Sequence, residues 1–305
     1  MNPGYYHLQI KEGEYIILYY HGWPQDKAGG VYMQIINLIE NTSGANDCIT
    51  GHGLSFYIET AAHKLLMDAG PSAAILENAE KLGISLAEVD TVILSHGHYD
   101  HGGGILPFTK VNNTARIYLH KDAAGDYYAF DGREKGYRYI GIDPEITELD
   151  QLVYVNQTTQ IDENLFLFCN ITGNRNRPDT NKRLLKKAGD HYIQDPFAHE
   201  LCLVIKDAGT SFLFSGCAHN GVLNILDRYK ELYKSEPDVM VSGFHMMKKT
   251  DYTNDEIQNI RNTAYELKRY HTVFYTCHCT GLPAYDIMKE ILGGQLHYVH
   301  CGEEI

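Results

Sequence analysis

Four short apolar runs, each followed by a histidine, constrain the fold of this chain more than any other feature of its sequence. The runs cover residues 91–95, 211–215, 238–242 and 272–276, and the histidines that follow them are His96, His219, His245 and His278. Runs of this length and character predict buried strands. Because ligands of open α/β sheets bind beyond the carboxyl ends of the strands, we expect these histidines to meet at one edge of a sheet.

Helix signals alternate with the strand signals. Further strands are expected at residues 31–39, 54–58 and 64–67, and helices at 74–82, at 222–233, from Thr253 onward and from Pro283 to Gly293. Thr253 and Glu256 have the spacing of a capping box, and Pro283 and Gly293 suit the two ends of a helix. The alternation predicts layered α/β architecture. We expect an N-terminal extension at residues 1–30 and one domain at 31–305, with about 120–195 forming an inserted lid.

Composition narrows the class of partner. A net charge of −13 argues against a surface for nucleic acid or anionic membranes, because both are polyanions. We find no signal peptide and no stretch of the about 18–20 apolar residues that a membrane helix needs, so a cytoplasmic protein is expected. Seven scattered cysteines indicate reduced thiols. A small-molecule substrate is the expected partner, and the basic stretch 174–187 is either an anion contact or a solvated face; oligomeric state is undetermined.

Four residues of ligand type follow the first histidine-bearing run within six positions. They are His96, His98, Asp100 and His101. Imidazole and carboxylate groups bind zinc, iron and manganese, and Gly97 lets the loop bend. If the first two residues face one ion and the last two face another, the pair of ions lowers the pKa of a bridging water. The alternative is a group of surface histidines beside a glycine turn, which a position directly after an apolar strand disfavours.

The segment Ser95–Gly102 resembles the His-x-His-x-Asp-His signature of the metallo-β-lactamase superfamily. Leu66–Gly70 is similar to the superfamily's upstream Asp-x-Gly turn, and Phe214–Cys217 to its downstream strand-end motif. A narrower set resembles a subgroup that includes 7,8-dihydropterin-6-yl-methyl-4-(β-D-ribofuranosyl)aminobenzene 5′-phosphate synthase-like proteins. That set comprises His52–Ser55, Gly216–His219, Gly243–His245 and His278–Gly281. The similarity runs from about residue 31 to the C-terminus.

The resemblance implies a four-layer αββα sandwich with two metal ions at the strand ends. The expected ions are zinc, with iron or manganese as alternatives. By the same resemblance His96 and His98 hold the first ion, Asp100, His101 and His278 hold the second, and Asp68 orients the ligand histidines. Where most of the superfamily's hydrolases have a bridging aspartate, this chain has Cys217.

Several assignments stay open at this stage. We favour His219 over His199 as third ligand of the first ion, because it lies at a strand end beside Cys217. His52 and His245 are expected to line the substrate pocket, although each also has a structural interpretation. Thr280 either contacts an anionic substrate or caps the helix that begins at Pro283.

The predicted function is a metal-dependent hydrolase in which a metal-bound hydroxide attacks an electrophilic carbon or phosphorus. Asp100 is the expected catalytic residue, binding metal and orienting the nucleophile. One alternative is a synthase- or lyase-type enzyme acting on a phosphorylated pterin-like or ribosyl aromatic substrate. The other is a non-catalytic, metal-containing binding protein.

Overall fold

The computed structural model describes residues 6–11, 14–19 and 33–305, which form two units that are described separately. In the first unit, strand β1 (Tyr6–Lys11) pairs antiparallel with β2 (Glu14–Tyr19). These strands fall within the expected N-terminal extension, whose other residues lie outside the described ranges. Part of the strand expected at 31–39 also lies outside them, and the observed strand β3 is Gln34–Ile39.

The second unit contains two large mixed sheets. The first sheet has the strand order β10 (Leu152–Val155), β7 (Arg116–His120), β6 (Thr91–Leu94), β5 (Lys64–Met67), β4 (Ser55–Glu59), β3. The second has the order β11 (Thr159–Gln160), β12 (Leu165–Phe168), β15 (Cys202–Asp207), β16 (Thr210–Ser215), β17 (Val239–Ser242), β18 (Val273–Thr276), β19 (Leu296–Tyr298). Strands β5, β6, β7 and β10 run parallel to one another, as do β16 to β19.

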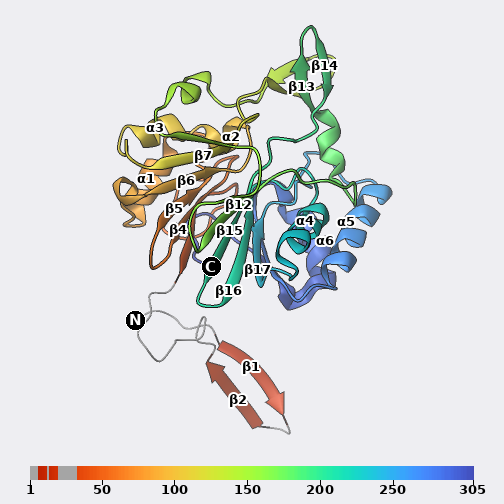
Figure 1. The fold of residues 1–305 in the computed structure, drawn as a ribbon. Coiled ribbons are helices and arrows are strands. Elements are labelled where there is room, and N and C mark those ends of the chain that lie inside the picture. Colours follow the sequence, from red (N-terminus) through yellow and green to blue (C-terminus); the bar gives the residue numbers. More distant parts are fainter. Residues whose placement is uncertain (1–5, 12–13, 20–32) are drawn as a thin grey trace. The chain divides into compact units, whose positions relative to one another are not determined.

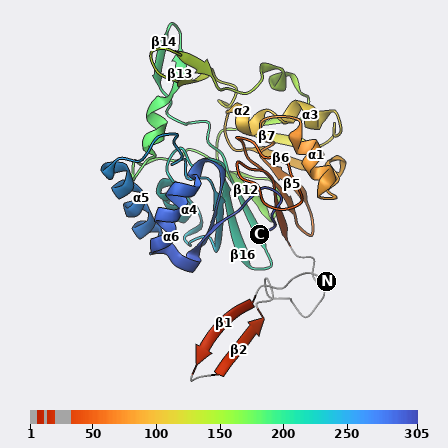
Figure 2. The ribbon, with the colours of Figure 1, turned by 180° about the vertical axis from the view of Figure 1, so that it is seen from behind.

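The two sheets pack face to face and helices cover their outer faces (Figures 1 and 2). Phe56 and Phe214 meet in the core between the sheets. Since side chains alternate along a strand, Leu65 faces this inner core and Leu66 faces the helices. The helices on the first sheet are α1 (Ala74–Lys81), α2 (Tyr99–Gly102) and α3 (Ile105–Thr109), and those on the second are α4 (Val222–Tyr233), α5 (Asn254–Leu267) and α6 (Leu282–Leu292). The predicted αββα sandwich is confirmed.

The helix boundaries agree closely with the sequence signals. Helix α4 has the predicted bounds, and Thr253 forms the expected capping box with Glu256 at the start of α5. Short 3-10 turns complete the unit at Leu86–Glu88, Pro144–Glu148, Asp179–Arg183, His278–Thr280 and Gly293–Gln295. Among the described residues, no helix combines the length and apolar character needed to cross a bilayer.

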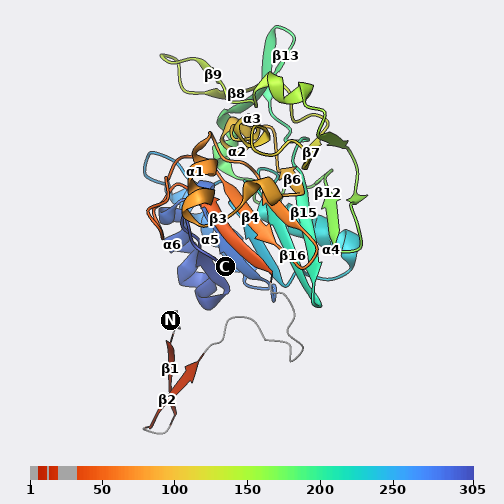
Figure 3. The ribbon, with the colours of Figure 1, turned by 90° about the vertical axis from the view of Figure 1, so that its left-hand side faces the viewer.

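The segment expected as an insertion at 120–195 is divided. Part of it forms a small antiparallel sheet with the order β14 (His191–Gln194), β13 (Leu184–Ala188), β8 (Tyr127–Phe130), β9 (Tyr137–Tyr139). Figure 3 shows this sheet beyond α2 and α3. The stretches 152–155 and 165–168 instead join the two main sheets, because their apolar side chains pack into the sandwich. An insertion of the whole segment is therefore incorrect.

Candidate metal centre

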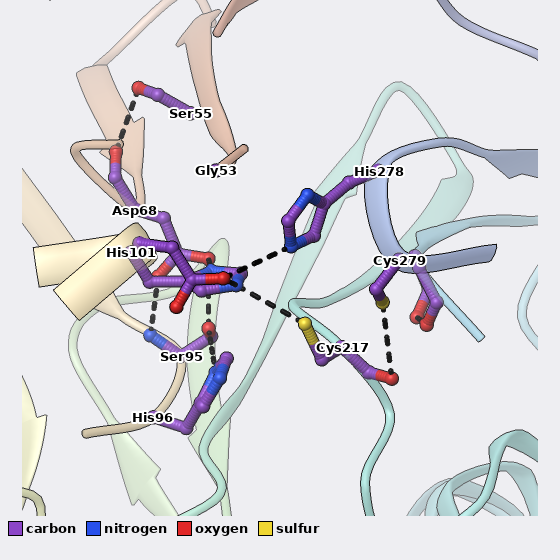
Figure 4. A network of polar contacts seen from close by, with 12 residues as sticks. Gly53, Ser55, Asp68, Ser95, His96, His101, Cys217, His278 and Cys279 are labelled. Carbon is purple, nitrogen blue, oxygen red and sulfur yellow. Dashed lines mark hydrogen bonds and ion pairs between the residues drawn. The ribbon is translucent and has the colours of Figure 1, made fainter. Parts of the chain in front are cut away.

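The strand ends bring the predicted ligands together. Parallel pairing of β5 with β6 places Asp68 beside Ser95, whose amide donates to Asp68 Oδ1 at 2.7 Å. Parallel pairing of β16, β17 and β18 places the residues that follow these strands at one edge of the second sheet. Those residues include Cys217 and His278, which face the loop after β6 across the sandwich (Figure 4).

Two glycines permit this close approach. A Cβ atom on Gly97 would lie 1.9 Å from the backbone oxygen of Ala123. A Cβ atom on Gly216 would lie 2.1 Å from Ser95 Oγ and 3.2 Å from Asp68 Oδ2. Real Cβ atoms essentially never make contacts under 3.0 Å, so the 1.9 and 2.1 Å approaches leave room only for glycine at either position.

The first cluster, here called the three-histidine group, consists of His96, His98 and His219. One ring nitrogen of each lies within 4.8 Å of the others, and His96 Nε2 is 3.2 Å from His219 Nε2. All three side chains are buried, and His98 Nε2 has no hydrogen-bond partner among the described residues. Burial, reinforced by neighbouring histidines, lowers the pKa of His98 to about 3 and holds the pKa values of His96 and His219 well below the ordinary range. The rings are therefore neutral, which is the form that binds metal.

The second cluster, the carboxylate group, consists of Asp100, His101 and His278. Asp100 Oδ2 lies 3.5 Å from His278 Nε2 and 3.9 Å from His101 Nε2. Burial alone would raise the pKa of Asp100, but the nearby His101 and His278 outweigh it and hold the pKa well below its usual range. His278 Nε2 is buried without a hydrogen-bond partner in the described part of the chain. An anionic oxygen beside inward-facing imidazole nitrogens is a donor set suited to a cation.

A polar partner holds the outward-facing nitrogen of four of these rings. The pairs are His96 Nδ1 with Ser95 Oγ at 2.8 Å, His101 Nδ1 with Asp68 Oδ2 at 2.6 Å, His219 Nδ1 with Asn181 Oδ1 at 3.0 Å, and His278 Nδ1 with Asn41 Oδ1 at 2.8 Å. In each ring Nε2 is left for the centre. Metal-binding histidines usually have such partners, which fix the ring orientation and the tautomer.

Cys217 lies between the two clusters. Its Sγ is 3.2 Å from His101 Nε2, and it groups with His96 on one side and with His278 and Cys279 on the other (Figure 4). Burial raises the pKa of the Cys217 thiol. A thiolate would supply a softer ligand here than a carboxylate.

His199 is placed differently from His219. Its Nδ1 accepts a hydrogen bond from the Gly97 amide at 2.9 Å, so its Nε2–H donates to Asp195 Oδ2 at 3.1 Å. Both nitrogens are therefore engaged in holding the loop before His98. This favours His219 as the third nitrogen of the first cluster.

The three residues expected in the substrate pocket differ in exposure. The side chain of His52 is 51% exposed and its Nε2 lies 3.3 Å from Asp100 Oδ2, at the rim of the centre. The ring of His245 lies 4.1 Å from that of His219, and its buried Nδ1 has no hydrogen-bond partner among the described residues. The Thr280 hydroxyl is buried, accepts from the Phe244 amide at 2.8 Å and lies 2.5 Å from Thr276 Oγ1. It does not cap α6, whose N-cap is Gly281.

Sequence reasoning missed the residues that orient the rings, apart from Asp68. Asn41 follows β3, and Asn181 lies in the turn that leads to the small sheet. A single asparagine in a loop carries no local signal of such a role. Tyr127 was missed for the same reason: it comes from the small sheet, and its ring lies 4.1 Å from that of His199.

Comparison with known proteins gives consistent results. Residues 49–166 match the family model of the metallo-beta-lactamase superfamily. A solved structure, described as a metal-dependent hydrolase of the beta-lactamase superfamily, is 29% identical, with a TM-score of 0.71 over 90% of this chain and 98% of that one. An uncharacterized protein of Methanocaldococcus jannaschii is 27% identical over 88% of this chain and 98% of its own length. A second protein of that organism, named 7,8-dihydropterin-6-methyl-4-(beta-D-ribofuranosyl)-aminobenzene-5′-phosphate synthase, is 25% identical over 90% and 96%.

Proposed function

We propose that this chain, a member of the metallo-β-lactamase superfamily, is a metal-dependent hydrolase of a small-molecule substrate. The observation that carries the proposal is a pair of buried nitrogens, one in each cluster, that have no hydrogen-bond partner among the described residues: His98 Nε2 and His278 Nε2. A buried polar atom without a partner is costly, and a cation in each cluster would remove that cost.

In this proposal the three-histidine group holds one ion and the carboxylate group holds the other. Cys217 lies between the two groups and would supply a thiolate ligand, and zinc would be the preferred ion because imidazole and thiolate ligands together suit it. Metal ions in such a centre activate water and stabilise negative charge that develops on the substrate. This fold hosts many reactions, so the proposal depends on the site and not on the fold alone.

The chain's own residues supply orientation and access. Asp100 keeps its carboxylate ionised beside His101 and His278, and is placed to accept a hydrogen bond from an attacking water. His52 lies beside the carboxylate group, and its exposed side chain is placed to contact a substrate that enters from solvent. Tyr127 and Phe197 are buried against the rings of His199 and His219, and exclude water from that side.

The test combines metal content with activity. Protein purified without added metal is analysed for bound ions and screened against phosphodiesters, thioesters and lactones with added zinc, manganese or iron. We expect the wild type to carry metal and His98→Ala to lose the ion of the three-histidine group together with turnover. His63→Ala is the matched control, because His63 pairs with Asp90 and Asp162 away from the centre. Wild-type activity in a metal-free protein would overturn the proposal.

A synthase-type reaction is the second candidate. It is favoured by the similarity to the named synthase across 90% of this chain, and by a cysteine in place of the bridging aspartate. Incubation with a dihydropterin and a ribofuranosyl-aminobenzene phosphate, followed by mass spectrometry, distinguishes the two. A condensation product without hydrolysis in the ester screen would favour the synthase. Bound metal without turnover in either assay would indicate a binding protein.

A further inference from the structure

Two fully buried glutamates lie outside the donor clusters and next to them. Glu40 follows β3 and Glu200 precedes β15, and their exposed fractions are 0% and 1%. All the hydrogen bonds they accept come from amide and hydroxyl groups. A buried carboxylate is expensive to desolvate, so two of them at one edge of the sandwich require an explanation.

Glu200 holds the loop that carries His219. Its Oε1 accepts the His219 amide at 2.5 Å, and its Oε2 accepts the backbone and side-chain amides of Asn220 at 3.0 and 2.9 Å. The residue before His219, Ala218, has a φ of +50°, which is strained for a residue with a Cβ atom. The carboxylate therefore stabilises a backbone shape that the loop would not adopt alone.

Glu40 makes the equivalent contacts on the other cluster. Its Oε1 accepts the His278 amide at 2.6 Å and the Tyr298 hydroxyl at 2.8 Å, while Oε2 accepts both the amide and the hydroxyl of Thr42. His278 itself has a φ of +49°. Each glutamate thus holds the main chain of one histidine, and the two histidines belong to different clusters.

We propose that Glu200 and Glu40 are positioning residues, each of which sets the affinity of one half of the centre. Glu200 acts through His219 on the ion of the three-histidine group. Glu40 acts through His278 on the ion of the carboxylate group. The inference rests on the proposed metal-dependent function, and it adds that each glutamate controls the affinity for a different ion.

The test measures Zn²⁺ affinity by chelator competition in proteins with one cluster disabled. His278→Ala leaves the three-histidine group, and His98→Ala leaves the carboxylate group. In the His278→Ala background, Glu200→Gln should weaken Zn²⁺ binding about 10- to 100-fold and Glu40→Gln should leave it unchanged. In the His98→Ala background, Glu40→Gln should weaken Zn²⁺ binding by the same factor and Glu200→Gln should leave it unchanged. Glutamine keeps the shape but offers one acceptor oxygen in place of two.

The matched control is Asn112→Ala. Asn112 is also buried and also holds a loop, through Ala115 N at 2.9 Å and Val89 O at 2.7 Å, at the opposite ends of the strands. It should lower thermal stability without changing Zn²⁺ affinity. Circular dichroism confirms folding of every variant, and Co²⁺ absorption of each glutamate variant in the intact centre reports which ion is lost.

Three outcomes would overturn the inference: equal weakening of both clusters by each glutamate variant, no weakening by either, or the same change with Asn112→Ala. Failure of the proposed function has a different signature, because the wild-type protein itself would then bind no Zn²⁺ or Co²⁺, or would bind metal without turnover while the glutamate variants still changed its affinity. Preferential loss of the three-histidine ion from Glu200→Gln and of the carboxylate-group ion from Glu40→Gln, each in the intact centre, supports the inference independently of the disabled backgrounds.

Discussion

Replacement of Asp68 by asparagine tests how the centre is held in place. The Asp68 carboxylate is fully buried and accepts three hydrogen bonds, from Ser95 N at 2.7 Å, Ser95 Oγ at 2.8 Å and His101 Nδ1 at 2.6 Å. Its backbone has a φ of +63°, a conformation that asparagine tolerates better than most residues. The substitution therefore removes one acceptor oxygen and the charge while keeping size and backbone preference.

The expected magnitude follows from the lost acceptor. The new NH₂ group must replace either Oδ1, which accepts the Ser95 amide, or Oδ2, which accepts both Ser95 Oγ and His101 Nδ1, so at least one buried donor loses its partner. An unsatisfied buried donor costs about 1–3 kcal/mol, and the upper end applies because the lost acceptor is charged. We expect metal-free Asp68→Asn to lose about 3 kcal/mol of unfolding free energy, and its affinity for one Zn²⁺ to fall about 10- to 100-fold because His101 is no longer oriented.

The assay is urea denaturation in the presence of a chelator, paired with Zn²⁺ competition. Asp195→Asn is the matched control, because Asp195 is also buried and also accepts from a histidine, His199, and from the Phe197 amide. It should cost similar stability and leave the ion of the carboxylate group in place. The reasoning is refuted if Asp68→Asn binds two ions with wild-type affinity, or if Asp195→Asn weakens the same ion equally.

Two further predictions concern pH and the glycine turn. Burial opposes protonation of His101, but Asp68 and Asp100 outweigh it and raise its pKa to about 9 from an ordinary value of 6.5. The protonated ring therefore stabilises the folded protein fully below pH 6.5, and this contribution is lost as pH rises to about 9, so the metal-free protein should lose about 3 kcal/mol of unfolding free energy over that interval. Urea midpoints measured across this pH range should show the decline in the wild type and little of it in Asp68→Asn. Gly97→Ala should abolish Zn²⁺ binding and lower the melting temperature because its Cβ would lie 1.9 Å from a backbone oxygen, whereas Gly294→Ala, which would meet no atom within 4 Å, should leave Zn²⁺ affinity unchanged.

Local sequence patterns were sufficient to predict the layers of the fold and the positions of the strand ends. The apolar runs, the capping box at Thr253 and the proline and glycine of α6 depend on contacts within a few residues, and they predict those elements within about two residues. The division of 120–195 was missed because β10 and β12 are short and only their pairing partners distinguish them from loop. Burial in the sandwich decides their structure, and burial depends on tertiary contacts.

The roles of single side chains in the centre also depend on tertiary contacts that local sequence does not contain. Both His199 and His219 lie close to a strand of the second sheet, and sequence spacing favours His219 without showing why. The distinction comes from Gly97 and Asp195, which engage both nitrogens of His199, and from Asn181, which engages only one of His219. Such partners come from distant parts of the chain, so no local pattern contains them.

Backbone strain connects the geometry of the centre with its chemistry. Apart from asparagine and aspartate, six non-glycine residues in the described part of the chain have positive φ, and four of them surround the centre: Phe197, Ala218, His245 and His278. Backbone of this kind costs about 1–3 kcal/mol per residue and persists only where surrounding contacts hold it. Glu200 and Glu40 hold the main chain at His219 and His278, Asp195 accepts the Phe197 amide, and Cys279 Sγ accepts the His245 amide. A bound cation would favour the same backbone, so metal affinity and loop conformation should be coupled, and the metal-free protein should be least stable at these strand ends.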